Sequence, residues 1–119
     1  MTQNITRHGV GARMSEAAVF NGVVYLAGMV GENSTGQDIE AQTRDVLAQI
    51  DKHLATCGSD KSRLLRVQIF LADLNDFAGM NAVWEQWVVP GATPPRATVE
   101  AKLANPGWKV EMVVTAAQA

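Results

Sequence analysis

The chain reads Val19-Phe20-Asn21-Gly22-Val23-Val24-Tyr25, with Asn-Gly set between two runs of β-branched and aromatic residues. Asn-Gly is a preferred pair for a two-residue hairpin turn, because both central residues need a positive φ. The stretch therefore predicts two antiparallel strands, over residues 16–20 and 23–29. Glycines and small polar residues at 31–36 then interrupt any periodic pattern and indicate a surface connection.

A long amphipathic helix is expected from Asp38 to Cys57. Acidic residues at its start suit the positive end of the helix dipole, and Gly58 stands just past its end. Its apolar residues recur at the spacing of one helix face. They are Ile39, Val46, Leu47, Ile50 and Leu54.

A second, shorter helix is expected after Asn75 and Asp76, which can cap its first turn. The pattern ends at Pro90-Gly91, which cannot continue a helix. Its apolar stripe consists of Phe77, Met80, Trp84, Trp87 and Val88. We expect the tryptophans to be core or interface anchors rather than ligand-stacking residues, because large aromatic side chains dominate burial energetics.

Three further strands complete the pattern. Residues 65–71 alternate apolar and other side chains with the period of a strand that has one dry face. Residues 96–103 and 108–117 are also strand-like, and the turn at Asn105-Pro106-Gly107 predicts that they close as a hairpin. The order β-β-α-β-α-β-β predicts an α+β sandwich, with one mixed sheet and both helices packed on one face. The other face, rich in Val and Ala, would need a partner, so we expect an oligomer.

Length and composition fit one domain over residues 1–119. The chain is 47% hydrophobic and 18% charged, which is typical of a globular protein. Its formal net charge is −2 and its basic residues do not cluster, so nucleic acid is not expected as a partner. The polar start Met1-Thr2-Gln3-Asn4 predicts neither a signal peptide nor a membrane-spanning helix, and we expect a cytoplasmic protein without membrane partners.

The single cysteine and the two histidines indicate no redox or metal chemistry. Cys57 has no second cysteine to pair with, and its place at the end of the first helix suggests a packed thiol. His53 is expected to be solvated or peripheral, and His8 lies far from it without a ligand spacing. We therefore expect neither a metal nor another cofactor.

One arginine stands out as a candidate ligand-binding residue. Arg96 follows Thr93-Pro94-Pro95 and begins an alternating strand-like run. The prolines fix φ and favour extended geometry before it, so the side chain starts from a pre-set position. A guanidinium matches a carboxylate bidentately and can orient a small anionic ligand. From spacing alone, an ordinary surface or salt-bridged arginine is the other interpretation.

Four blocks, in this order, make the chain resemble the YjgF/YER057c/UK114 family, also called the RidA or reactive-intermediate deaminase family, over nearly its whole length. The blocks are Tyr25-Leu26-Ala27-Gly28; Phe70-Leu71-Ala72-Asp73-Leu74-Asn75-Asp76-Phe77 followed by Asn81; Pro94-Pro95-Arg96-Ala97-Thr98-Val99-Glu100; and Lys109-Val110-Glu111. The resemblance implies a chorismate-mutase-like homotrimer with a cleft between subunits. Its activity would be the hydrolytic deamination of small 2-imino or enamino acids, without a cofactor.

The resemblance also implies the roles of individual residues. Arg96 would bind the substrate carboxylate and Glu111 would hold the attacking water, while Asn81 and Gly28 would line the same cleft. Without the resemblance, we would interpret Glu111 as a solvated strand carboxylate paired with Lys109 or Lys102.

Three cleft positions depart from the family's best-known branch. Met14 stands where that branch usually carries a tyrosine, Ala27 replaces a hydroxyl residue, and Thr98 stands where a cysteine is common. These departures predict a different preference for the imine side chain. A non-catalytic trimeric module that binds small carboxylate metabolites is the alternative function. A ribonuclease or inhibitor of translation, also described in this family, is disfavoured by the acidic charge.

Overall fold

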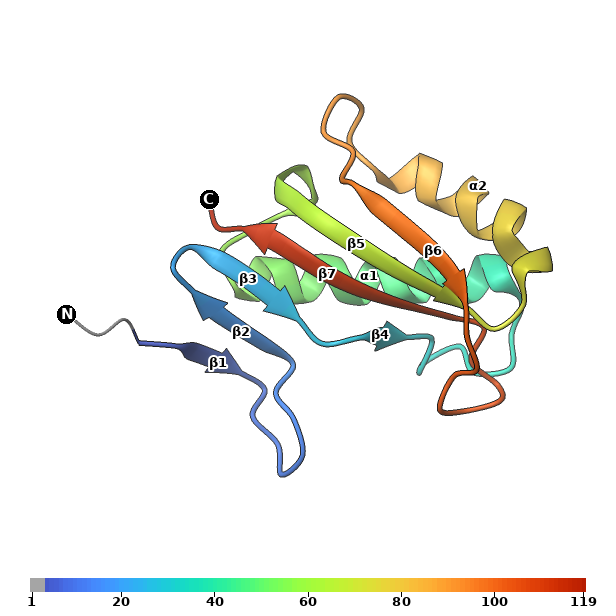
Figure 1. The fold of residues 1–119 in the computed structure, drawn as a ribbon, viewed down its shortest axis with the longest axis horizontal. Helices are drawn as coiled ribbons and strands as arrows, with labels where there is room; N and C mark the ends of the chain where they lie inside the picture. The colour runs from blue at the N-terminus through green and yellow to red at the C-terminus, as the bar shows by residue number, and fades with distance from the viewer. Residues whose placement is uncertain (1–3) are drawn as a thin grey trace.

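The computed structural model describes residues 4–119 as one mixed seven-stranded sheet with two α-helices (Figure 1). The main sheet order is β1-β2-β3-β7-β5-β6, and β4 pairs with β7. Two short 3-10 helices, η1 and η2, precede β5 and α2. In chain order the elements are β1 Thr6–His8, β2 Ala17–Phe20, β3 Val23–Leu26, β4 Met29–Val30, α1 Ile39–Thr56, η1 Lys61–Arg63, β5 Leu64–Leu71, η2 Leu74–Asp76, α2 Phe77–Trp87, β6 Arg96–Glu100 and β7 Val110–Ala117.

The hairpin predicted from Asn-Gly is confirmed. Asn21 and Gly22 both have positive φ, at 57° and 77°, and they join the antiparallel strands β2 and β3. The strand expected over 23–29 is broken after Leu26 and continues separately as β4. The three-residue strand β1 was not predicted, because a segment so short carries no readable alternation.

Both helices form close to their predicted limits. Asp38 caps α1, and its side chain accepts a hydrogen bond from the Ala41 amide at 2.9 Å. The cap expected for α2 is different, because Asp76 makes no side-chain cap bond and Asp73 instead caps the preceding 3-10 turn. Short polar residues before a helix thus predicted its start but not which of them caps it.

The predicted closing hairpin is wrong. β6 and β7 are not neighbours, because β5 lies between them, parallel to β6 and antiparallel to β7. The two strands are also shorter than expected, since β6 ends at Glu100 and β7 begins at Val110. The intervening loop carries the chain past the end of β5. β7 then fills the middle of the sheet, where every second side chain from Val110 to Ala116 is buried.

The hydrophobic core lies between the helices and one face of the sheet. In Figure 1, α1 crosses behind the sheet and α2 lies next to β6. The core side chains of β5 and β7 alternate with residues on the open face, which neither α1 nor α2 covers. Tyr25 and Val99 on that open face are 50% and 45% exposed. This apolar exposure agrees with the expectation that the sheet needs a partner.

The connection at residues 31–36 is held against α1. The Asn33 amide and the Ser34 hydroxyl donate hydrogen bonds to the Asp45 carboxylate, at 3.0 and 2.7 Å. Partial burial raises the pKa of Asp45, but hydrogen bonds from Ser34, Gln49 and Asn33 outweigh it and leave the pKa below its ordinary value. The loop therefore depends on an ionised Asp45.

Within residues 4–119, no helix is long and apolar enough to cross a membrane. The prediction about the polar N-terminus rests on Met1 to Asn4, and residues 1–3 lie outside the described part of the chain.

Candidate active site

Arg96 occupies the first position of β6 and faces α2. Its guanidinium carbon lies 5.2 Å from the ring centroid of Trp84 and 5.9 Å from that of Phe77, which are cation–π distances. In the sheet register Arg96 stands opposite Val67, a fully buried residue of the core face. The strand and the helix therefore hold the guanidinium together, on the helix-covered side of the sheet.

The guanidinium has no carboxylate partner among the described residues. The ion pair found within 4.0 Å in residues 4–119 joins His53 and Glu16, at 3.9 Å. Burial lowers the pKa of Arg96, and the more distant charge of Glu85 opposes this shift. An arginine remains protonated at neutral pH. Arg96 therefore presents a partly buried positive charge with no carboxylate within 4.0 Å among the described residues, so the interpretation as a salt-bridged surface arginine does not describe it.

Two other predicted site residues lie on the same side of the sheet as Arg96. Thr98 stands two residues further along β6, opposite Ile69 on the same face, and its buried hydroxyl oxygen has no hydrogen-bond partner. Asn81 lies one helical turn after Phe77 and three residues before Trp84, on the stripe of α2 that faces Arg96. We call Arg96, Thr98 and Asn81 the arginine half-site.

Glu111 and Gly28 form a second cluster, at the other side of the sheet. Glu111 is the second residue of β7 and stands opposite Val30 of β4. Gly28 lies against its carboxylate, because a β-carbon at position 28 would collide with Oε2 of Glu111 and lie 3.0 Å from its Cδ. Only a residue without a side chain leaves this carboxylate in place.

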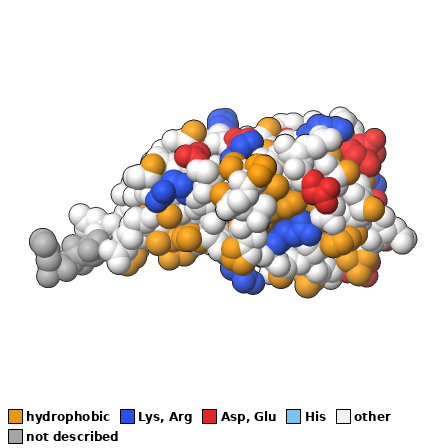
Figure 2. Space-filling model, turned by 90° about the horizontal axis from the view of Figure 1, so that it is seen from above, with side chains coloured by type: hydrophobic (Ala, Val, Ile, Leu, Met, Phe, Trp, Pro, Cys, Tyr) orange, Lys and Arg blue, Asp and Glu red, His pale blue; other side chains and the backbone are white. Residues whose placement is uncertain are grey.

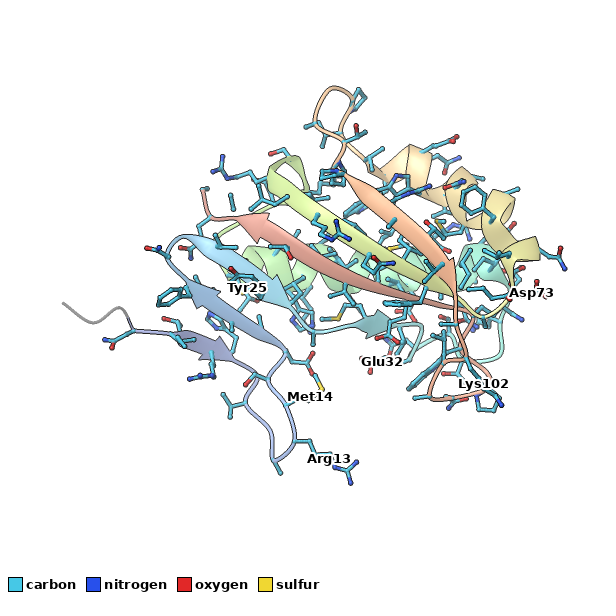
Figure 3. The ribbon with its side chains drawn as sticks, viewed as in Figure 1. Arg13, Met14, Tyr25, Glu32, Asp73 and Lys102 are labelled. Carbon is cyan, nitrogen blue, oxygen red and sulfur yellow. The ribbon has the colours of Figure 1, made fainter. Side chains whose placement is uncertain are left out.

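Glu111 lines a cavity of about 300 Å³. Met14 projects into the region from the loop between β1 and β2, and Glu32 follows β4 at the same edge (Figure 3). Ala27 borders the cluster through its backbone, donating to the Glu16 carbonyl at 2.9 Å, while its side chain packs against the core. We call Glu111, Gly28 and Met14 the glutamate half-site. The full lining of the cavity is Met14, Glu16, Gly28, Met29, Val30, Glu32, Gln49, Ala104, Trp108 and Glu111.

A larger cavity, of about 690 Å³, is lined mainly by the loop after β6. It shares Ala104 and Trp108 with the cavity of Glu111, but none of the predicted site residues lines it. The smaller cavity is the candidate site because Glu111 and Gly28 line it.

A single chain does not bring the two half-sites together. Arg96 stands opposite Val67 of β5, whereas Glu111 stands opposite Phe70. Val67 and Phe70 are three positions apart along β5, and because side chains alternate along a strand, an odd offset places them on opposite faces of the sheet. Arg96 therefore lies on the helix side and Glu111 on the open side. The same ligand could contact both only if they came from different subunits.

Burial and pairing bear on the sequence predictions for three further side chains. The predicted packed thiol is confirmed, since Cys57 is 3% exposed and burial raises its pKa. Glu111 forms no ion pair with Lys109 or Lys102 among residues 4–119. Trp84 is a core residue, as expected, but it also supports Arg96. Trp108 was not singled out from the sequence, although it lines the cavity of Glu111 and directly precedes the Lys109-Val110-Glu111 block.

Comparison with known proteins identifies the family of the chain. A family model described as Endoribonuclease L-PSP matches residues 5–118. A RutC family protein of Haemophilus ducreyi is 50% identical over 113 residues, which cover 95% of this chain and 96% of that protein. The RutC family protein YoaB of Escherichia coli K12 is 48% identical, with 95% and 97% covered.

Solved structures give the same result for the fold. The structure of NMB1025 from Neisseria meningitidis, described as a member of the YjgF protein family, has a TM-score of 0.94 and 51% sequence identity, and the match covers 98% of this chain and 96% of that one. A mixed sheet with two helices on one face and these four sequence blocks thus define an α+β protein of the YjgF class. The chain belongs to the YjgF/YER057c/UK114 family, and its relatives include the RutC family proteins.

Proposed function

We propose that the protein is a hydrolytic deaminase of small 2-imino or enamino acids, giving the 2-oxo acid and ammonia. The observation that carries this proposal is the state of Arg96. Its guanidinium is partly buried, stacked on Trp84 and Phe77, and without a carboxylate partner among the described residues. A preorganised cation of this kind suits a substrate carboxylate, because a planar guanidinium binds it bidentately.

The chemistry needs little besides positioning. With the carboxylate held on Arg96, the imine carbon C2 is fixed in place, and Glu111 accepts a proton from a water that attacks C2. Glu111 passes that proton to the imine nitrogen, which gives a carbinolamine. The carbinolamine hydroxyl then transfers its proton to the amine as the C–N bond breaks, which releases the 2-oxo acid and ammonia. General acid–base assistance of this type contributes about 10²–10⁴-fold. The unpartnered Thr98 hydroxyl and the Asn81 side chain supply further hydrogen bonds to the ligand. We place this activity in the cytoplasm.

We propose that the complete site forms between subunits of a homotrimer. Two observations support this: Arg96 and Glu111 lie on opposite faces of one sheet, and the open face exposes apolar side chains such as Tyr25 and Val99. A ring with head-to-tail interfaces can bring the arginine half-site of one subunit against the glutamate half-site of the next. Light scattering should give the mass of three chains. A monomer at micromolar concentration would contradict the proposed intersubunit site.

The activity is tested with 2-imino acids generated in situ by an amino-acid oxidase, whose loss is followed by semicarbazide trapping. Wild type should accelerate hydrolysis, and Arg96→Ala should abolish the acceleration while leaving the oligomer intact. Retained activity in Arg96→Ala would remove the proposed carboxylate anchor.

Subunit mixing tests where the two residues come from. Neither Arg96→Ala nor Glu111→Gln should be active alone, but subunits of the two variants refolded together at equal amounts should recover about one quarter of the wild-type sites. That fraction of interfaces combines an intact arginine from one chain with an intact glutamate from another. Mixtures that stay inactive would place both residues in the same subunit's site.

A non-catalytic module that binds small carboxylate metabolites is the competing function, since the same arginine half-site would hold a 2-oxo acid without any chemistry. Calorimetric binding of 2-oxo acids, together with no acceleration of any imine, would favour it. The family model's description names an endoribonuclease, but the chain has a net charge of −2. On the face in Figure 2, Lys and Arg side chains are scattered among acidic and hydrophobic ones. Phosphate contacts would need them clustered.

A further inference from the structure

Trp108 reaches the cavity of Glu111 from the loop between β6 and β7. Its indole nitrogen donates a hydrogen bond to the Thr35 hydroxyl at 3.1 Å, which fixes one edge of the ring. The ring lines the same cavity as Glu111 and Gly28. A large, rigid aromatic surface therefore stands beside the carboxylate that is proposed to hold the water.

A buried glutamine holds the loop that carries this tryptophan. Gln42 of α1 is fully buried, and its amide donates to the Gly107 carbonyl while its oxygen accepts from the Lys109 amide, both at 2.8 Å. The backbone on each side of Trp108 is thus fixed to the helix. The ring position is set before any ligand binds, so little conformational freedom is lost on binding.

The other side chains of the cavity indicate what the indole could contact. Met14, 52% exposed, adds a flexible thioether, which packs well against apolar and aromatic groups. Glu16 and Glu32 also line the cavity. Their charges disfavour a ligand with a second carboxylate, because like charges repel strongly in a partly desolvated space.

We propose that Trp108 and Met14 form the side-chain subsite of the imine site, and that it selects 2-imino acids with a neutral apolar side chain larger than a methyl group over those with an acidic one. This inference rests on the proposed function for its substrate class. The preference itself concerns a binding surface, so it can be measured without turnover.

Two readouts test the subsite on the intact protein. The first is kcat/KM for imines made in situ from phenylalanine, leucine, alanine and glutamate. The second is binding of phenylpyruvate, pyruvate and 2-oxoglutarate, followed by calorimetry. The variants are Trp108→Ala and, as a matched control, Trp87→Ala, whose ring lies in a separate groove between α1 and α2.

In wild type, kcat/KM should be at least about tenfold higher for the phenylalanine and leucine imines than for the alanine and glutamate imines. The affinity for phenylpyruvate should exceed the affinities for pyruvate and 2-oxoglutarate by a similar factor, a discrimination typical of apolar pockets. Trp108→Ala should remove most of this difference and leave kcat/KM for the alanine imine within about threefold of the wild-type value. Trp87→Ala should keep the difference.

The outcomes separate the subsite from the activity. If wild type and Trp108→Ala both deaminate the imines with the same ranking of kcat/KM, the proposed subsite is wrong and the proposed deaminase activity is retained. Absence of any turnover, with phenylpyruvate binding that is selective and depends on Trp108, supports the subsite and overturns the deaminase. Absence of both turnover and selective binding overturns both.

Discussion

Replacing Gly28 by alanine should disable the site by moving one carboxylate. The added β-carbon would collide with Oε2 of Glu111 and lie 3.0 Å from its Cδ and 3.3 Å from its Cγ. Ordinary contacts require more space, so the carboxylate must move by about 1 Å. A displacement of that size at a reacting group can lower kcat by about 10²-fold, which corresponds to about 2.7 kcal/mol in the activation free energy.

The fold should tolerate the same substitution. Gly28 is not among the glycines with positive φ, so alanine can adopt its backbone conformation. A compatible Gly→Ala change stabilises by about 0.4–1 kcal/mol through the unfolded chain, which offsets part of the local crowding. The free energy of unfolding, measured in urea, should therefore change by less than about 1 kcal/mol.

The assay is semicarbazide competition with a 2-imino acid generated in situ, applied to Gly28→Ala, Glu111→Gln and the double variant. Because alanine at position 28 acts through the carboxylate, the double variant should lose no more activity than Glu111→Gln alone. A Gly28→Ala enzyme with wild-type kcat would refute the reasoning. So would additive losses in the double variant, because they would show that Gly28 acts on something other than Glu111.

Three further predictions concern the arginine, the loop clamp and the acid stability of the loop after β4. Arg96→Lys keeps the charge but loses the planar fork and the ring stacking, so kcat/KM should fall at least about tenfold with the melting temperature unchanged; an equal rate would mean that charge alone suffices. Gln42→Leu removes the partners of the Lys109 amide and the Gln37 carbonyl, while the Gly107 carbonyl keeps its bond from the Gly36 amide. Urea unfolding should show a loss of about 2–4 kcal/mol, and a loss below about 1 kcal/mol would show that water replaces the glutamine. Because the pKa of Asp45 is lowered in the folded protein, its contribution to the free energy of unfolding is complete above the ordinary pKa of 3.8. This contribution is lost as the pH falls through the lower folded pKa. The difference in melting temperature between wild type and Asp45→Asn should therefore shrink in that acid range, and a constant difference would contradict the role of the charge.

Local chemistry made most of the secondary structure predictable. The Asn21-Gly22 turn needs only two residues with positive φ, and the stripe of α1 needs only helical spacing. The position of β7 was not predictable in this way. Asn105-Pro106-Gly107 does form a turn, since the Gly107 amide donates to the Asn105 side chain at 2.8 Å, but this turn lies inside a longer loop rather than between paired strands. Turn chemistry reports local geometry and says nothing of which strand the chain meets next.

The same limit explains what the sequence revealed about the site. The four blocks indicated Arg96 and Glu111, and periodicity could not reveal that the sheet separates them. That separation depends on β5 lying between β6 and β7, with Val67 and Phe70 as their respective partners. Had the two strands formed the predicted hairpin, one chain could have held both residues on one face. Because they do not, the chemistry proposed for Arg96 and Glu111 requires a neighbouring subunit, and the apolar open face supplies a surface on which that subunit can pack. In the proposed trimer, catalysis and assembly are linked by the strand order, so a variant that weakens this trimer should lose activity in proportion to the trimer lost, even when Arg96 and Glu111 are both intact.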